Sequence, residues 1–146
     1  EALNQKSASS EVKDGMDMTV CVIDHSRDKL YFAGANNPLY FIRNCELTHI
    51  KGDKMPVAIH ELMQDFQLHE LDLQKGDTFY TFSDGFVDQF GGEKRKKYKS
   101  VNFKKLLLSI QEESMVEQKL IIEKTFDKWR GNIEQIDDVS VIGLRL

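Results

Sequence analysis

The chain has 146 residues, of which 40% are hydrophobic and 30% are charged, and its formal net charge is −4. These values are ordinary for a globular protein and predict a single domain over residues 1–146. The acidic balance argues against a nucleic-acid binder, and no apolar run approaches the ~20 residues of a membrane-spanning helix. Two cysteines do not make a disulfide framework, which favours a reducing, cytoplasmic setting.

The beginning of the chain is polar and does not contain an initiator methionine. It reads EALNQKSASSEVKD. We interpret the sequence as a piece cut from a longer protein, in which residues 1–12 are a helix tail or a linker.

Strands are predicted for most of the chain between residues 16 and 84. The runs that carry this signal are apolar or β-branched and lie at 18–24, 29–35, 38–44, 46–52, 66–73 and 78–84. Only Asn36 and Asn37 separate the second run from the third. Because asparagine tolerates positive φ, we expect a tight hairpin there. The last run is apolar on both faces, which indicates a strand that is covered on two sides.

Helices are predicted for the part of the chain that follows Gly92. Apolar residues recur at helical spacing between residues 103 and 110. Ser114 and Glu117 form a capping-box pattern at the start of a second helix, for which Gly131 is the expected end. The closing segment 138–146 alternates like a strand. Strands followed by two helices and one more strand predict a layered α+β domain.

Three pairs of aspartates lie at the boundaries of predicted strands. They are Asp84 with Asp88, Asp137 with Asp138, and Asp14 with Asp17. Carboxylate oxygens are the ligands that Mg²⁺ and Mn²⁺ prefer, and a glycine such as Gly85 lets the backbone turn sharply beside an ion. Asp–Gly is also the commonest turn dipeptide, so the spacing alone leaves both a metal site and ordinary turns open.

Four segments of the chain together resemble one protein family. They are VKDGMDMTVCVID, LYFAGANNPLYFIR, GDTFYTFSDGFVDQFGG and IDDVSVIGLRL, in this order. In series at these distances they resemble the C-terminal half of the SpoIIE-type metal-dependent protein phosphatases, which are relatives of protein phosphatase 2C. The most specific parts are the apolar strand that ends in SDG and the Asp–Asp pair before the last strand.

The resemblance implies a fold, a set of metal ions and a reaction. The fold would be a sandwich of two antiparallel β-sheets flanked by helices, truncated here at its N-terminal side. One end of it would bind two Mg²⁺ or Mn²⁺ ions, with a third, weaker site in some members. Water activated by the metals would hydrolyse phosphoserine or phosphothreonine on a signalling protein.

The resemblance also assigns individual residues. Asp84 matches the metal ligand of the SDG motif, and Asp137 matches the ligand of the terminal Asp–Asp motif. Asp14 matches the position that binds the third metal in some members. The residues expected to lie around these ligands are Asp88, Gly85 and Asp138. Asp88 would either lie behind the ligands or share the third ion, and for Asp138 we expect a cap or a pairing with backbone.

The motifs of the family's N-terminal half are missing from this sequence. That half carries an acidic motif and an Asp-x-x-Gly motif, both of which bind metal. Two carboxylates cannot neutralise and orient two divalent ions, so we expect this piece alone to bind metal weakly and to be inactive. The longer parent protein would be the enzyme.

Two other functions and several partners stay open at this stage. The alternatives are a non-catalytic pseudophosphatase that acts as a regulatory binding module, and a β-rich sensor domain without phosphate chemistry. The resemblance implies an anti-anti-sigma-like phosphoprotein substrate, an upstream sensory or receiver domain, and a cytoplasmic domain that a membrane sensor in the parent protein could tether. An exposed sheet edge would permit dimerisation.

A basic run, EKRKKYK, occupies residues 93–99 directly after the SDG motif. It could attract an acidic phosphoprotein surface near the metals. The alternative is a solvated connector ahead of the helix, which is what such charge runs usually are.

Overall fold

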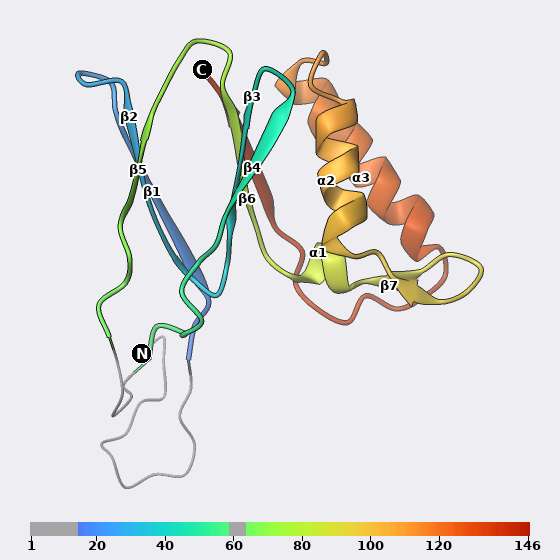
Figure 1. Cartoon of the computed structure of the whole chain (residues 1–146). Helices are drawn as coiled ribbons and strands as arrows, with labels where there is room; N and C mark the ends of the chain where they lie inside the picture. Colours follow the sequence, from blue (N-terminus) through green and yellow to red (C-terminus); the bar gives the residue numbers. More distant parts are fainter. Residues whose placement is uncertain (1–14, 59–63) are drawn as a thin grey trace, which may run out of the picture. The chain divides into compact units, whose positions relative to one another are not determined.

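The computed structural model describes residues 15–58 and 64–146. Figure 1 shows its helices and strands with labels. Residues 1–12 and Asp14, for which predictions were made from the sequence, lie outside the described residues. The chain divides into two compact units, one from residues up to 39 and 50–74, the other from 40–49 and 75–146.

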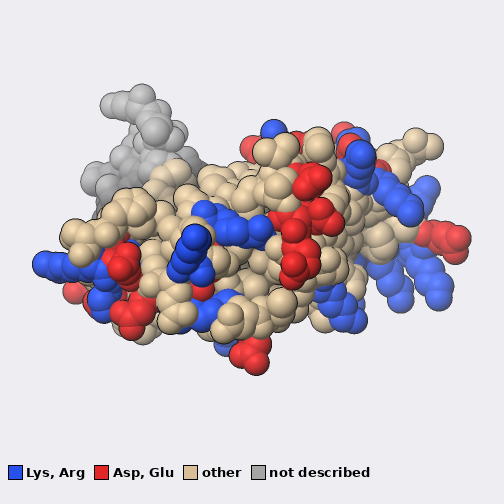
Figure 2. All heavy atoms as spheres, turned by 90° about the horizontal axis from the view of Figure 1, so that it is seen from above, with Lys and Arg blue, Asp and Glu red and all other residues tan. Residues whose placement is uncertain are grey.

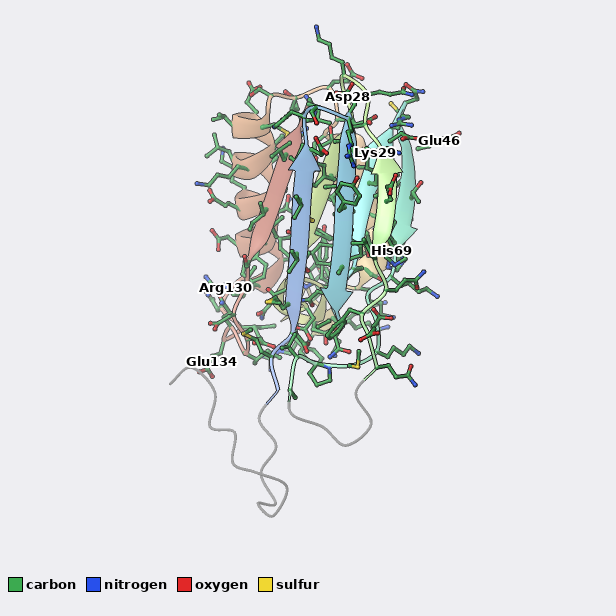
Figure 3. The ribbon with its side chains drawn as sticks, turned by 90° about the vertical axis from the view of Figure 1, so that its left-hand side faces the viewer. Asp28, Lys29, Glu46, His69, Arg130 and Glu134 are labelled. Carbon is green, nitrogen blue, oxygen red and sulfur yellow. The ribbon has the colours of Figure 1, made fainter. Side chains whose placement is uncertain are left out.

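The first unit contains a three-stranded antiparallel sheet. Its strand order is β1 (Met18–Asp24), β2 (Lys29–Ala35), β5 (His69–Asp72). Lys29 bridges across this sheet to the carboxylates of Glu70 and Asp72, at 2.6 and 2.9 Å. Figure 3 labels Lys29 and His69, which come from the neighbouring strands β2 and β5.

The second unit contains a four-stranded sheet and two long helices. The strand order is β4 (Glu46–Ile50), β3 (Leu39–Arg43), β6 (Thr78–Phe82), β9 (Val141–Arg145), and β6 pairs with β9 in antiparallel orientation. Helices α2 (Ser100–Ser109) and α3 (Met115–Arg130) lie beside this sheet in Figure 1.

The core of the second unit is built from aromatic and aliphatic side chains of the sheet and the helices. Its buried members include Tyr40, Tyr80, Phe82, Phe86, Tyr98, Phe103, Leu107, Ile122 and Phe126. Phe103 and Leu107 come from the helical spacing found in the sequence, and each is fully buried. This core fixes the ends of β6 and β9, from which the candidate site is formed.

Three short elements between β6 and α2 were not predicted from the sequence. They are the single-turn helix α1 (Gly85–Asp88) and the two-stranded ribbon of β7 (Phe90–Gly91) with β8 (Lys96–Lys97). The helix α1 has four residues and each strand of the ribbon has two, which is too short for a periodic pattern to be recognised.

The α+β prediction is confirmed, because the chain forms antiparallel sheets with a few helices. The predicted capping box of α3 is present, since the Ser114 side chain accepts from Glu117 N–H and the Glu117 side chain accepts from Ser114 N–H. Gly131 ends α3 at φ 55°. None of the helices in the described part of the chain is long and apolar enough to cross a membrane.

The predicted hairpin at Asn36 and Asn37 is wrong, although Asn36 does adopt a positive φ of 60°. The strand before it, β2, and the strand after it, β3, belong to different sheets. The backbone at this junction pairs elsewhere, because Asn36 N–H donates to the Asp53 carbonyl and Asp53 N–H donates to the Gly34 carbonyl, each at 2.8 Å. A long-range pairing therefore replaces the local turn.

Candidate functional site

The pairing of β6 with β9 brings two aspartate pairs together at one end of the second unit's sheet. The strands run antiparallel, and Phe82 at the end of β6 is opposite Val141 at the start of β9. One residue further, Ser83 N–H donates to the carbonyl of Ser140 at 3.0 Å. Asp84 therefore leaves the sheet at the end where Asp138 enters it.

The side chain of Ser83 links the two strand ends a second time. Its hydroxyl donates to the carbonyl oxygen of Asp138 at 2.8 Å and accepts the N–H of Ser140 at 2.9 Å. The sequence analysis did not identify Ser83 as a site residue. Its position between a buried strand and the Asp–Gly pair was the available signal.

Gly85 has a steric role at this junction. A Cβ at Gly85 would lie 2.4 Å from the carbonyl oxygen of Asp138, which is backbone and has little freedom to move. The absence of a side chain thus lets the start of α1 approach the segment before β9. The sequence predicted a glycine that permits a sharp turn, and the structure shows in addition a close contact between two chain segments.

Asp88 lies one helical turn after Asp84. Its N–H donates to the Asp84 carbonyl at 2.9 Å, which closes α1. The Asp88 carboxylate forms a 2.8 Å ion pair with Lys97 of β8. Asp88 therefore connects the acidic end of the sheet to the basic ribbon of β7 and β8.

The terminal aspartate pair is held by local backbone bonds. The carboxylate of Asp137 accepts the N–H of Asp138 at 2.7 Å, and the Asp137 carbonyl accepts from the side chain of Gln135 at 2.8 Å. In the sequence analysis Asp138 was the residue expected to cap or pair with backbone. In the structure the bonds of Asp138 are made by its own backbone: its N–H donates to the Asp137 carboxylate, and its carbonyl accepts from the Ser83 hydroxyl.

Gln89 joins the end of α1 to the segment before Asp137, and Trp129 bonds to Gln89. Neither contact was predicted from the sequence. Gln89 is fully buried, and its side chain donates to the carbonyls of Phe90 and Glu134, each at 3.0 Å. The indole N–H of Trp129 donates to the Gln89 carbonyl at 3.0 Å. Figure 3 labels Glu134 just beyond the end of α3, in the segment that leads to Asp137.

Three carboxylates predicted to lie in or around a metal site come together at one end of the second unit's sheet. Asp84, Asp137 and Asp138 are all exposed and lie at the same end of the sheet, and their oxygens suit a hard cation. Among residues 15–58 and 64–146, no three acidic, histidine or cysteine side chains gather closely enough to hold a metal ion. Asp14 is outside these ranges, and the carboxylate of Asp17, in the first unit, accepts a 2.7 Å hydrogen bond from Asn36. The donors fit the expected metals in type and are fewer than six, the number that octahedral Mg²⁺ requires.

One protein-family model matches the chain over its whole length. Residues 1–146 match the family described as stage II sporulation protein E (SpoIIE). A search of the curated proteins gives no significant match.

Three solved structures illustrate the similarity in fold. The SiaA-PP2C domain of Pseudomonas aeruginosa is 32% identical, with a TM-score of 0.82 over 89% of this chain and 51% of that chain. The PP2C phosphatase domain with a fragment of the regulatory domain of SpoIIE from Bacillus subtilis is 17% identical, with a TM-score of 0.70 over 89% and 37%. The serine/threonine phosphatase PstP/Ppp of Mycobacterium tuberculosis is 17% identical, with a TM-score of 0.61 over 90% and 60%. This chain therefore spans between 37% and 60% of the length of these three chains.

Proposed function

Because the chain belongs to the SpoIIE family of PP2C-type phosphatase domains, we propose that it is the C-terminal part of the catalytic domain of a metal-dependent protein serine/threonine phosphatase. The observation that carries this proposal is the pairing of β6 with β9. It places Asp84 and Asp137, which are 53 positions apart in the sequence, at the same end of one sheet.

The metal ligands proposed within the described residues are Asp84 and Asp137, and Asp14 is proposed for a third, weaker site. When bound, Mg²⁺ or Mn²⁺ would lower the pKa of water and offset the charge of the phosphate. One solved structure of the PstP catalytic domain, 17% identical with a TM-score of 0.58, is a complex with two manganese ions, which supports manganese as a candidate. This chain's contribution is to hold the two carboxylates in place through the Ser83 hydrogen bonds and the close approach at Gly85.

We propose that the substrate is a phosphoserine or phosphothreonine on a signalling protein of the anti-anti-sigma type. The similar structures include the SiaA-PP2C domain and the RsbU and RsbW domains of Rv1364c from Mycobacterium tuberculosis, the names of which support a regulatory setting. The remaining metal ligands and an upstream sensory or receiver domain would come from the longer parent protein. The chain alone would then bind metal weakly and lack activity.

A second candidate is a non-catalytic pseudophosphatase that binds a partner without hydrolysing it. A pseudophosphatase would keep the fold without binding metal, although the presence of both Asp84 and Asp137 favours the phosphatase. The pseudophosphatase hypothesis predicts that the complete protein binds its partner but turns over no phosphorylated substrate with any divalent cation.

The deciding experiment uses the complete protein with Mn²⁺ and a phosphoserine peptide. Asp84→Asn and Asp137→Asn should each lower kcat/KM about 100-fold or more, because each removes a charge that stabilises the transition state through the metal. Calorimetric titration with Mn²⁺ should show weaker binding in both variants. The matched control is Asp127→Asn, an exposed aspartate of α3, which should change neither quantity. Full hydrolysis by both site variants would refute the proposal, and an inactive wild type that still binds its partner would favour the pseudophosphatase.

A further inference from the structure

The segment that connects α1 to α2 is strongly basic. Residues 93–99 contain five lysines and arginines and one glutamate, in a chain whose net charge is −4. The five cationic side chains, Lys94, Arg95, Lys96, Lys97 and Lys99, are all exposed. Figure 2 colours all Lys and Arg side chains blue and shows them at several places on the surface, interspersed with Asp and Glu in red. We call the segment from Phe90 to Lys99, which includes β7 and β8, the basic hairpin.

The base of the basic hairpin is fixed to the end of α3. Gly92 N–H donates to the carbonyl of Trp129 at 2.9 Å. A Cβ at Gly91 would lie 2.1 Å from that same carbonyl oxygen, so only glycine allows the two segments to approach this closely. The ring of Tyr98, directly after β8, packs edge-on against Trp129 with centroids 5.4 Å apart. The basic hairpin is therefore a positioned element, which argues against a loosely solvated connector.

The basic hairpin is also fixed to the helix that follows Asp84. Tyr98 N–H donates to the Gln89 carbonyl at 3.0 Å, and Lys99 N–H donates to the Val87 carbonyl at 2.7 Å. The ion pair between Lys97 and Asp88 adds a side-chain contact. Since α1 is a single turn with a rise of about 1.5 Å per residue, the basic hairpin begins within roughly 10 Å of Asp84 along the chain axis.

Most of the positive charge on this hairpin is unneutralised within the described part of the chain. Lys97 is paired with Asp88, whereas Lys94, Arg95, Lys96 and Lys99 form no ion pair with residues 15–58 or 64–146. Four neighbouring cations repel one another, and this repulsion is relieved when an anionic partner binds. Because Lys97 contacts Asp88, which lies one helical turn after Asp84, the positive charge of the hairpin is carried close to the acidic end of the sheet.

We propose that the basic hairpin is the docking site for an acidic segment of the phosphoprotein substrate, next to the phosphorylated serine or threonine. This inference rests on the proposed phosphatase function and specifies the kind of substrate. The phosphate itself belongs at the carboxylate end of the sheet, and carboxylates that flank it in the substrate would meet the lysines and Arg95. A nucleic acid fits less well, because its continuous row of phosphates would also face the acidic residues Glu134, Asp137 and Asp138.

The test compares two phosphoserine peptides of equal length, one with acidic and one with neutral flanking residues, using the complete protein with Mn²⁺. The triple variant Lys94→Gln/Arg95→Gln/Lys96→Gln removes three charges from the hairpin. Its matched control, Lys105→Gln/Lys119→Gln/Lys124→Gln, removes three exposed charges from α2 and α3. We expect wild type to prefer the acidic peptide, and the hairpin variant to lower the ratio of the two kcat/KM values about 10-fold or more, mainly through KM. The control variant should keep the wild-type ratio, and raising the salt concentration should reduce the ratio only where the hairpin is intact.

A binding measurement separates failure of this inference from failure of the proposed function. Isothermal titration calorimetry of both peptides into the Asp84→Asn protein reports docking when hydrolysis is absent. Loss of acidic-peptide affinity in the hairpin variant, with hydrolysis missing in every protein, would support docking and overturn the phosphatase proposal. Active protein with equal kcat/KM for both peptides, or equal losses in the hairpin and control variants, would overturn the docking proposal. Displacement of the acidic peptide by polyuridylate at equal charge concentration would do the same, because it would show a site for any polyanion.

Discussion

The hydroxyl of Ser83 donates a 2.8 Å hydrogen bond to the carbonyl oxygen of Asp138, across 55 positions of sequence. The same hydroxyl accepts the N–H of Ser140. A single small side chain thus joins the end of β6 to the segment before β9, immediately beside both aspartate pairs. We therefore expect this junction to help fix the spacing between the proposed ligands Asp84 and Asp137.

Replacement of Ser83 by alanine should weaken the junction. Ser83→Ala removes two hydrogen bonds and leaves the N–H of Ser140 without its side-chain acceptor, so the free energy of unfolding should fall by about 1–2 kcal/mol. Urea denaturation measures this change, and kcat/KM should fall as well because the strand ends separate. Ser109→Ala is the control, since that hydroxyl bonds only to the Leu106 carbonyl in its own helix. Equal effects of the two variants would contradict the importance of the junction.

A side chain at position 85 should separate the same two segments. In Gly85→Ala the new Cβ would lie 2.4 Å from the Asp138 oxygen and 3.0 Å from its carbonyl carbon, so one backbone segment must move. Overpacking of this kind costs about 1–3 kcal/mol, and activity should be lost even at temperatures where the variant is folded. Gly76→Ala serves for comparison. No atom lies within 4 Å of its added Cβ, so its cost comes only from the positive φ of 93° and its activity should persist.

The ion pair between Arg43 and Asp77 should contribute measurably to the stability of the second unit. Two hydrogen bonds of 2.8 and 2.6 Å join the guanidinium to the carboxylate, and Asp77 is only 1% exposed. Arg43 is partly exposed, so Asp77→Asn should lower the free energy of unfolding by about 2–3 kcal/mol, below the range for fully buried pairs. Asp72→Asn, which affects an exposed pair with Lys29, should cost about 0.5 kcal/mol or less.

A double-mutant cycle checks that the loss at Asp77 comes from the pair itself. Arg43→Met and Asp77→Asn together should cost less than the sum of the single changes, because the double variant leaves neither charge unpaired. Additive losses would show that Asp77 acts through other contacts.

The capping box of α3 predicts a pH dependence with a defined sign. The Ser114 hydroxyl and N–H both donate to the Glu117 carboxylate, and these bonds lower the pKa of Glu117 in the folded protein. Because the pKa is lowered on folding, the ionised carboxylate stabilises the fold at any pH above the ordinary pKa of about 4.3. This contribution is lost as the pH falls through the pKa of Glu117 in the folded protein. Glu117→Gln should therefore be less stable than wild type at pH 7, and the difference should vanish in the acid range. Urea midpoints from pH 7 to pH 3 measure it, with Glu112→Gln as the control; a constant difference would refute the prediction.

Much of this fold could be predicted because the signals are local. The β-branched run at 18–24 became β1 with the same bounds, and the Ser114–Glu117 pattern became the start of α3. The junction at Asn36 shows the limit of such reasoning. The conformation of Asn36 follows from its own chemistry, but the sheet to which the next strand, β3, belongs is set by its neighbours β4 and β6, and β6 is distant in sequence.

In the candidate site, too, the features with a local sequence signal could be predicted and those made by tertiary contacts could not. That aspartates follow β6 and precede β9 could be predicted, since both strands have clear apolar patterns. The Ser83 junction and the packing of Gly91 on Trp129 could not, because a serine and a glycine pair carry no periodic signal and acquire their roles only through tertiary contact. The metal-ligand roles of Asp84, Asp137 and Asp14 remain predictions.

The packing of Trp129 under the basic hairpin gives the protein a natural optical reporter. It is the single tryptophan of the chain, and its indole N–H is bound to the carbonyl of Gln89 at the hairpin base. Indole emission responds to the polarity and hydrogen bonding around the ring. A change in its wavelength or intensity would therefore register events at the hairpin in the unlabelled protein, without interference from a second fluorophore of the same kind in this chain.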